Sequence, residues 1–285
     1  MSPPDPTVFD RKPWLALTPQ DLGPTRRVPT MLHMPERKLY LWLTSVWASG
    51  AGAVVDLGCF AGGSTALLAQ GLKRAGLPGP VHAYDAFTIA ERLKDKYLYP
   101  AGIAPFEGED MLPAARELLA PWAGRVAFHP GRIEEQGWDG GPIEILVMDA
   151  SKTAKTMDRM AEIFFPHLIP GRSVVVQQDF LHWKQPWVAV QMERMADRFR
   201  PLAHAPRDTV AFLTEAPVDA SGLERGRCAD LTDAEMIDSL DRMRERMRGF
   251  GVGRGLKTLA AAVRLNPGKR AAAGFRTAPP QDDAA

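Results

Sequence analysis

The sequence predicts a doubly wound α/β fold, because short apolar runs alternate along the chain with segments of helical periodicity. Several of these runs end in an aspartate, which is typical of parallel strands that carry a ligand site at their carboxyl edge. The chain has 285 residues, of which 45% are hydrophobic and 24% are charged. This composition is that of a globular protein with one large core and modest additions.

Six apolar runs are predicted as strands. Their length and the turn residues that bound them are typical of buried parallel strands. They cover residues 53–58, 81–87, 125–131, 143–151, 173–180 and 209–215. Because helical segments separate most of them, we expect parallel βαβ units in one sheet.

Helices are predicted between these strands. The clearest covers residues 64–75, and Ser64 stands where a side chain would cap the first turn. One further helix is predicted to begin at Pro35. Three others are predicted over residues 111–124, 154–168 and 185–199. Residues 88–110 are of mixed polarity and predict a loop with some helix.

We predict four parts along the chain. The first is proline-rich and extended, the second holds the sheet, the third is a helical extension, and the fourth is an alanine- and proline-rich, disordered tail. Their boundaries are 1–34, 35–216, 217–268 and 269–285. In the third part, Thr232 and Glu235 have capping-box spacing, which predicts the start of a helix.

Charge and composition also bear on partners and location. The formal net charge is +1, which favours neither nucleic acid nor an anionic surface as a partner. No run approaches the roughly 18 apolar residues of a membrane helix. The amino terminus does not resemble a signal peptide, and two cysteines cannot form a disulfide framework. We therefore expect a soluble, cytoplasmic protein.

Arginines recur near the carboxyl terminus, at positions 242, 244, 246 and 248. They indicate either a solvated helix face or a surface for RNA or another anionic partner. The methionine-rich face of the same segment could pack on the main domain or on a second subunit, so a homodimer is a further hypothesis.

A glycine-rich loop, DLGCFAGGST at residues 56–65, follows the first predicted strand. Its glycines permit a tight turn and close approach of the backbone to a ligand. The G-x-G-x-x-G spacing of dinucleotide-binding loops does not occur. A carboxylate at Asp56 would gain nothing from a pyrophosphate but would favour a ligand with an ammonium and a sulfonium. The charge therefore favours S-adenosylmethionine over NAD.

This loop resembles motif I of the class I S-adenosylmethionine-dependent methyltransferases, with Phe60 in place of the middle glycine. The paired glycines followed by serine resemble the macrocin O-methyltransferase and cephalosporin hydroxylase branch. The resemblance covers roughly residues 35–215 and implies a Rossmann-like, mostly parallel seven-stranded sheet. The cofactor-binding residues that it implies, with a contact to the adenine from residues 129–132, are Asp56, Gly58, Phe60, Gly62, Gly63, Ser64, Asp85, Arg132 and Asp149.

Three polar residues at strand ends are assigned more specific roles. Asp85 ends the second predicted strand, where a carboxylate can accept the ribose hydroxyls of an adenosyl group. Asp149 ends the fourth, where the resemblance implies an acid near the reacting methyl. His182 follows the fifth, and an imidazole is a natural proton acceptor near neutral pH. Asp149 and His182 are therefore the candidate catalytic residues.

A metal is a separate hypothesis. The resemblance implies paired acids after the fifth strand, used as ligands, but here Gln178 precedes Asp179. Magnesium prefers carboxylate oxygens, so the missing acid weakens the case for a site at Asp149 and Asp179 without removing it.

Methyl transfer from S-adenosylmethionine to an oxygen of a small molecule is the function that these features favour. Two alternatives stay open, namely a metal-dependent, hydroxylase-like enzyme on the same fold and a protein that binds the cofactor without turnover. The identity of the methyl acceptor does not follow from the sequence.

Overall fold

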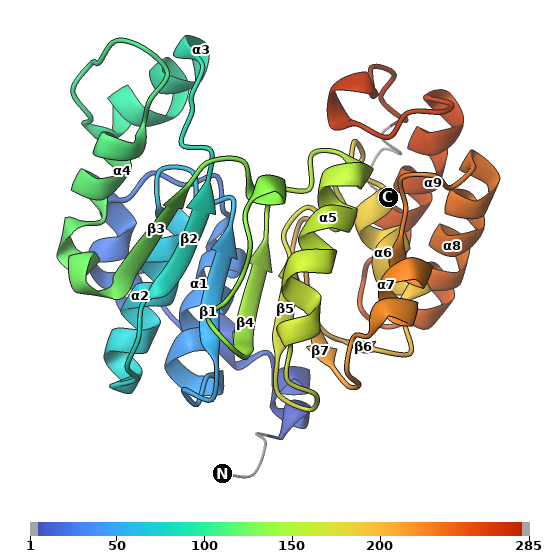
Figure 1. Ribbon diagram of the computed structural model, residues 1–285, viewed down its shortest axis with the longest axis horizontal. Helices are drawn as coiled ribbons and strands as arrows, with labels where there is room; N and C mark the ends of the chain where they lie inside the picture. Colours follow the sequence, from blue (N-terminus) through green and yellow to red (C-terminus); the bar gives the residue numbers. More distant parts are fainter. Residues whose placement is uncertain (1–4, 281–285) are drawn as a thin grey trace. The chain divides into compact units, whose positions relative to one another are not determined.

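The computed structural model describes residues 5–280 and contains a seven-stranded sheet of order β3-β2-β1-β4-β5-β7-β6 (Figure 1). The strands are β1 Ala53–Leu57, β2 Val81–Asp85, β3 Val126–Pro130, β4 Ile143–Met148, β5 Val174–Gln177, β6 Phe199–Ala205 and β7 Thr209–Thr214. β1 pairs in parallel with β2 and β4, and β2 with β3, whereas β7 is antiparallel to β5 and β6. The predicted doubly wound, mostly parallel fold is confirmed.

β6 was not among the predicted strands. It contains Arg200, Pro201 and His204, which interrupt any apolar run or strict alternation. Its place comes from pairing with β7, in a register that shifts between Pro201 and Ala203. Such a strand depends on its tertiary partner more than on local propensity.

Helices connect the strands. The α-helices are α1 Met34–Trp42, α2 Gly63–Ala75, α3 Glu91–Leu93, α4 Leu112–Leu118, α5 Ala154–Phe164, α6 Trp187–Arg194, α7 Ala220–Gly226, α8 Asp233–Arg246 and α9 Gly253–Leu265. The 3-10 and π segments are η1 Pro6–Arg11, η2 Pro13–Ala16, η3 Gln20–Arg27, η4 Leu43–Trp47, η5 Lys94–Leu98, η6 Tyr99–Ala101, η7 Ala120–Arg125, η8 Ile133–Glu135, η9 Phe165–His167 and η10 Ala272–Gly274. Within residues 5–280, no helix has the length and apolar character needed to cross a bilayer.

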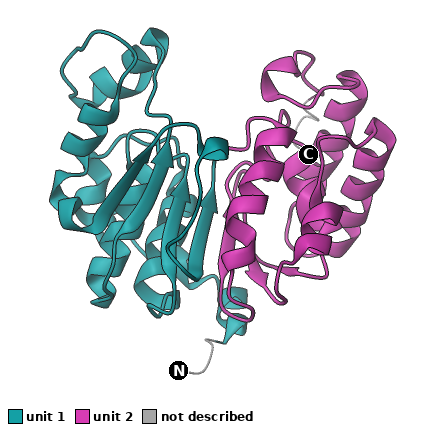
Figure 2. Cartoon of the chain, viewed as in Figure 1, with its two compact units in different colours: residues 1–149 teal, residues 150–285 magenta. Residues whose placement is uncertain are grey.

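The chain divides into two compact units, residues 1–149 and 150–285 (Figure 2). The first holds β1 to β4, and its amino-terminal segment forms short 3-10 helices where an extended segment was expected. These helices bury Phe9 and Trp14, and the Phe9 ring lies 5.0 Å from the rings of both Trp42 and Trp47. Burial of these aromatic rings outweighs the tendency of a proline-rich segment to stay extended.

A 24-residue excursion, residues 88–111, follows β2 in this unit and is called the cap here. It contains α3, η5 and η6, and Figure 1 shows it beyond the carboxyl ends of the strands. Two backbone hydrogen bonds of 2.9 Å close its neck, from the N–H of Ile89 to Glu109 and from the N–H of Met111 to Phe87. The buried Lys94 ammonium donates to Glu91 Oε2 at 2.8 Å and lies over the Phe106 ring. The cap therefore has internal contacts of its own.

The second unit holds β5 to β7 and the carboxyl-terminal helices. α8 packs on both α6 and α9, and its buried stripe contains Met236, Leu240 and Met243. Within residues 269–280, where a disordered tail was expected, the structure has η10, and Phe275 is 1% exposed and packs its ring edge-on against Trp187. The remaining expectations for the termini, at residues 1–4 and 281–285, lie outside the described residues.

Candidate functional site

The carboxyl end of β1 lies between its two neighbours in the sheet. The N–H of Asp149 donates to the Leu57 carbonyl at 2.8 Å, and the N–H of Gly58 donates to the Tyr84 carbonyl at 2.8 Å. The ends of β1, β2 and β4 therefore meet at one edge of the first unit. In open parallel sheets this edge is where ligands bind.

The glycine loop turns sharply after β1. Gly58, Phe60 and Gly62 all have left-handed backbone conformations, with φ of +96°, +49° and +97°. A Cβ on Gly63 would lie 2.4 Å from Thr30 Cβ, so the fold itself requires a glycine there. A Cβ on Gly62 would likewise lie 2.7 Å from Leu119 Cδ1, so Gly62 packs directly against the Leu119 side chain. These two glycines are explained by packing, and their contact with a cofactor remains a prediction.

Asp56 lies beneath this loop and is wholly buried. Its Oδ2 accepts hydrogen bonds from Ser64 Oγ at 2.8 Å and Thr65 Oγ1 at 2.6 Å. Its Oδ1 is buried and has no hydrogen-bond partner among residues 5–280. Burial raises the pKa of Asp56 to about 6, although the two hydroxyl groups lower it. The prediction that Ser64 caps α2 is wrong, because the helix begins at Gly63 and Ser64 bonds to Asp56 instead.

Asp85 connects the end of β2 to the glycine loop. Its Oδ2 accepts the N–H of Phe60 at 2.9 Å, and its Oδ1 accepts the N–H of Phe87 at 2.7 Å. Its backbone carbonyl accepts the N–H of Gly131 from the turn after β3. These two backbone N–H groups hold the Asp85 carboxylate beside the glycine loop.

Arg132 follows Gly131 in the turn after β3, but its side chain interacts with two glutamates that follow it in the chain. It is 67% exposed, and its guanidinium forms ion pairs with Glu134 at 2.5 Å and Glu135 at 3.2 Å. The structure brings Asp56, Asp85 and the Asp149 backbone to one edge, while a contact of Arg132 with a cofactor stays a prediction.

Asp179 and His182 lie in the second unit. Asp179 Oδ2 accepts hydrogen bonds from Lys152 Nζ at 2.7 Å and from Gln185 Nε2 at 2.5 Å. An ammonium and an amide N–H on the same carboxylate oxygen are not the oxygen ligands that a divalent cation prefers. Within residues 5–280, no group of three or more potential ligand side chains is arranged to hold a metal ion. The donor set around Asp179 does not fit the metal that was considered there.

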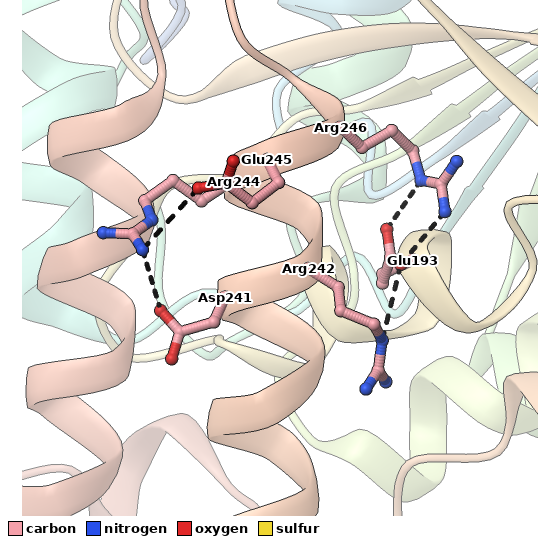
Figure 3. A pocket seen from close by; sticks show the side chains of 6 residues that line it. All are labelled: Glu193, Asp241, Arg242, Arg244, Glu245 and Arg246. Atoms are coloured by element: carbon pink, nitrogen blue, oxygen red, sulfur yellow. Dashed lines mark hydrogen bonds and ion pairs between the residues drawn. The ribbon is translucent and has the colours of Figure 1, made fainter.

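Three of the arginines near the carboxyl terminus, Arg242, Arg244 and Arg246, lie on α8 and line a hollow together with three acids (Figure 3), and Arg248 follows the helix. Arg246 Nε donates to Glu193 Oε2 at 2.8 Å, and Arg242 approaches the same carboxylate at 3.6 Å. Arg244 faces Asp241, and Arg248 pairs with Glu245. Carboxylates therefore balance these charges, which favours the interpretation as a solvated helix face.

Two further residues at the site were not predicted. Thr65 donates to Asp56, and a hydroxyl beside Ser64 in the sequence was the available signal for it. Tyr97 of the cap packs its ring edge-on against Phe60, with 6.1 Å between the ring centroids. The cap has no periodicity that could have placed Tyr97 beside the glycine loop.

No family model matches this sequence, and no curated protein does either. Solved structures with a similar fold do exist. The O-methyltransferase NovP shares 16% identity and a TM-score of 0.51, with 66% of this chain and 82% of NovP covered. Cofactor-bound Rv0187 from MTB shares 17% identity and a TM-score of 0.44, with coverage of 76% and 99%. The SAH-bound methyltransferase PaMTH1 from Podospora anserina is 13% identical in sequence and has a TM-score of 0.41, with 75% of this chain and 88% of PaMTH1 covered.

The TM-score of 0.51 with NovP is a similarity of fold, and this chain has the strand order β3-β2-β1-β4-β5-β7-β6. The chain therefore has the Rossmann-like fold of the class I S-adenosylmethionine-dependent methyltransferases. At this level of identity the similarity shows the fold alone, and the activity has to be argued from the site.

Proposed function

We propose that this chain is an S-adenosylmethionine-dependent methyltransferase that acts on an oxygen of a small molecule. The observation that carries the proposal is the buried Asp56 carboxylate, whose Oδ1 has no partner within residues 5–280. A buried carboxylate oxygen that lacks a hydrogen-bond donor is costly, and a nearby cation offsets that cost. A cofactor with an ammonium and a sulfonium brings that charge to the glycine loop.

The residues at this edge fit such a cofactor. When bound, S-adenosylmethionine supplies a methyl group on a sulfonium, which needs little further activation. Asp85 would hold the ribose hydroxyls, since the Phe60 and Phe87 N–H groups already orient its carboxylate toward the loop. Gly58 and Phe60 would present backbone to the ligand, and the turn after β3 that contains Arg132 would border the adenine.

Methyl transfer to a hydroxyl also requires a general base that takes the hydroxyl proton of the substrate. Asp149 is our first candidate, because its backbone bonds to Leu57 at the same edge as the glycine loop. His182 is the second, because it follows β5 in the chain and an imidazole nitrogen can act as a general base. The variants Asp149→Asn and His182→Gln test the two candidates. The variant that loses turnover but still binds S-adenosylhomocysteine like wild type identifies the general base. We derive no step through a metal, given the donors around Asp179.

NovP is an O-methyltransferase, and we propose by analogy that this chain also transfers the methyl group to an oxygen atom. Assignment to the macrocin O-methyltransferase branch is likewise proposed. One observation favours a second candidate function, which is cofactor binding without turnover. Lys152 forms an ion pair with Asp179, the acid that would otherwise be available to a metal or substrate. Binding of the cofactor without methyl transfer to any of a broad panel of hydroxylated acceptors would support this second candidate.

Isothermal titration with S-adenosylhomocysteine tests the binding step. We expect wild type to bind, and Asp85→Asn to bind at least about tenfold more weakly, because charge-assisted hydrogen bonds to the ribose are lost. Asp95→Asn, an exposed acid of the cap, is the matched control and should bind like wild type. No binding by wild type, or tight binding of NAD instead, would overturn the proposal.

A further inference from the structure

Two arginines of the first unit, Arg26 and Arg37, have no ion pair with an acid among residues 5–280. Arg37 belongs to α1, and its Nε and Nη2 are buried with no hydrogen-bond partner among the described residues. Arg26, in the last turn of η3, is exposed. Burial lowers the pKa of Arg37, and the positive charge of Arg26 lowers it further.

This arrangement is costly for the folded chain. A buried N–H without an acceptor costs about 1–3 kcal/mol, and more when the group is charged. Elsewhere the chain pairs its partly buried arginines with carboxylates, as it does for Arg246 and Glu193. Neither Arg26 nor Arg37 has an ion pair in the described part of the chain. An unpaired guanidinium of this kind is suited to an anionic ligand, because its planar fork matches a carboxylate or a phosphate.

The segment between these arginines lies beside the glycine loop. Pro29 and Thr30 approach Gly63 so closely that no Cβ fits there, and they therefore lie against the start of α2. The same segment leaves Met31 54% exposed, which adds an apolar surface. A ligand held here would have its acidic group near Arg37 and an apolar part near Met31.

We infer that Arg37 and Arg26 form a binding site for a carboxylate or phosphate group, and that this group belongs to the methyl acceptor. The inference rests on the proposed function, and it narrows the acceptor to small molecules with an acidic group and an apolar part. Arg37 would position the acceptor, and Arg26 would add charge at the entrance of the site.

Inorganic phosphate is the first probe, with ionic strength held constant by sodium chloride. We expect phosphate to raise the Tm of wild type, because a ligand of the folded state stabilises it. Arg37→Met should lose this response, and without phosphate it should be at least as stable as wild type, because an unpaired buried charge is gone. The matched control Arg27→Met, an exposed neighbour, should respond like wild type. An unchanged response in Arg37→Met, or a lower Tm of this variant without phosphate, would overturn the inference.

A second pair of probes separates the acceptor from the cofactor. S-adenosylhomocysteine carries a carboxylate, whereas 5′-methylthioadenosine lacks the amino-acid part. We expect Arg37→Met to bind both with the Kd of wild type. If it loses about tenfold or more in affinity for S-adenosylhomocysteine alone, the site holds the cofactor's own carboxylate and the acceptor assignment is wrong. If wild type binds neither nucleoside, the proposed function fails, while the phosphate response still tests the anion site.

Discussion

The N–H of Phe60 donates a hydrogen bond of 2.9 Å to Asp85 Oδ2, which joins the glycine loop to the end of β2. Phe60 can make this bond because it adopts a left-handed conformation with φ of +49°. In the commoner form of this loop a glycine stands at this position, and a glycine would adopt that conformation without strain. The phenylalanine adds a side chain that reaches the cap, so the loop, Asp85 and the cap form one connected structure.

The pH dependence of stability should reveal the buried carboxylate of Asp56. Burial raises its pKa to about 6 from an ordinary 3.8, so the folded chain holds the proton more tightly than the unfolded chain. The contribution of Asp56 to the unfolding free energy is therefore greatest below about pH 4 and decreases as the pH rises to about 6. At about 1.4 kcal/mol per pKa unit, the total change is on the order of 3 kcal/mol.

Asp56→Asn removes this titration but keeps an oxygen for the hydroxyl groups of Ser64 and Thr65. Denaturant unfolding of both proteins from about pH 4 to about pH 7 gives the difference in unfolding free energy. We expect wild type to lose stability relative to Asp56→Asn as the pH rises. A difference that stays constant with pH would show that the carboxylate is not buried as the structure has it.

The contact between Phe60 and Tyr97 should appear as an energetic coupling between the glycine loop and the cap. Edge-to-face aromatic pairs contribute about 0.5–1.5 kcal/mol beyond their burial. A double-mutant cycle with Phe60→Leu and Tyr97→Leu should give a coupling in this range. Tyr99, whose ring faces Phe106 instead, is the control and should couple more weakly with Phe60. Equal couplings for the two tyrosines would contradict the packing described here.

Glu144 is predicted to matter for stability and not for cofactor binding. It lies near the start of β4, away from the glycine loop, and is wholly buried. Its carboxylate accepts the N–H groups of Ser49, Gly50 and Ala51 and the Ser49 hydroxyl. Glu144→Gln should lower the unfolding free energy by about 1–3 kcal/mol, because several charge-assisted bonds weaken. Titration of the folded variant should give the wild-type Kd for S-adenosylhomocysteine, and a weaker Kd would place the binding site elsewhere.

Asp158 has a comparable structural role in the second unit. Its carboxylate accepts the N–H groups of Cys228 at 3.0 Å and Ala229 at 2.9 Å. Asp158→Ala leaves a buried N–H without an acceptor, and we expect a loss of about 2–4 kcal/mol in thermal unfolding. The comparison is Asp197→Ala, which breaks an exposed ion pair with Arg225 and should cost less than about 1 kcal/mol. Similar losses in the two variants would be evidence against this account of Asp158.

The sequence predicted those elements whose signal is local. The apolar runs at β1, β4, β5 and β7 are recognisable because both faces of a central strand are buried, as in β4. Asp56, Asp85 and Asp149 come together at one edge of the first unit, since the carboxyl ends of the parallel strands β1, β2 and β4 coincide there. Local signals were misleading where a tertiary partner decides, as for β6 and for Ser64, whose hydroxyl bonds to Asp56 rather than to the helix end.

Other features depend on long-range packing and leave no trace in the periodicity. The close contact of Thr30 with Gly63 joins residues 33 positions apart, and Tyr97 of the cap packs against Phe60 of the glycine loop, 37 positions away. The buried nitrogens of Arg37 likewise follow from how α1 packs, because an arginine in an amphipathic helix is expected to face solvent. Residues that select an acceptor are often of this kind, which is why the acceptor did not follow from the sequence.

A crystal structure with S-adenosylhomocysteine tests the central claim most directly. We predict that the adenosyl group lies at the carboxyl ends of β1 and β2, with its ribose hydroxyls on Asp85 and its amino-acid part over the glycine loop above Asp56. A ligand bound elsewhere, a glycine loop closed by the Phe60 side chain, or a dinucleotide in this place would contradict the account.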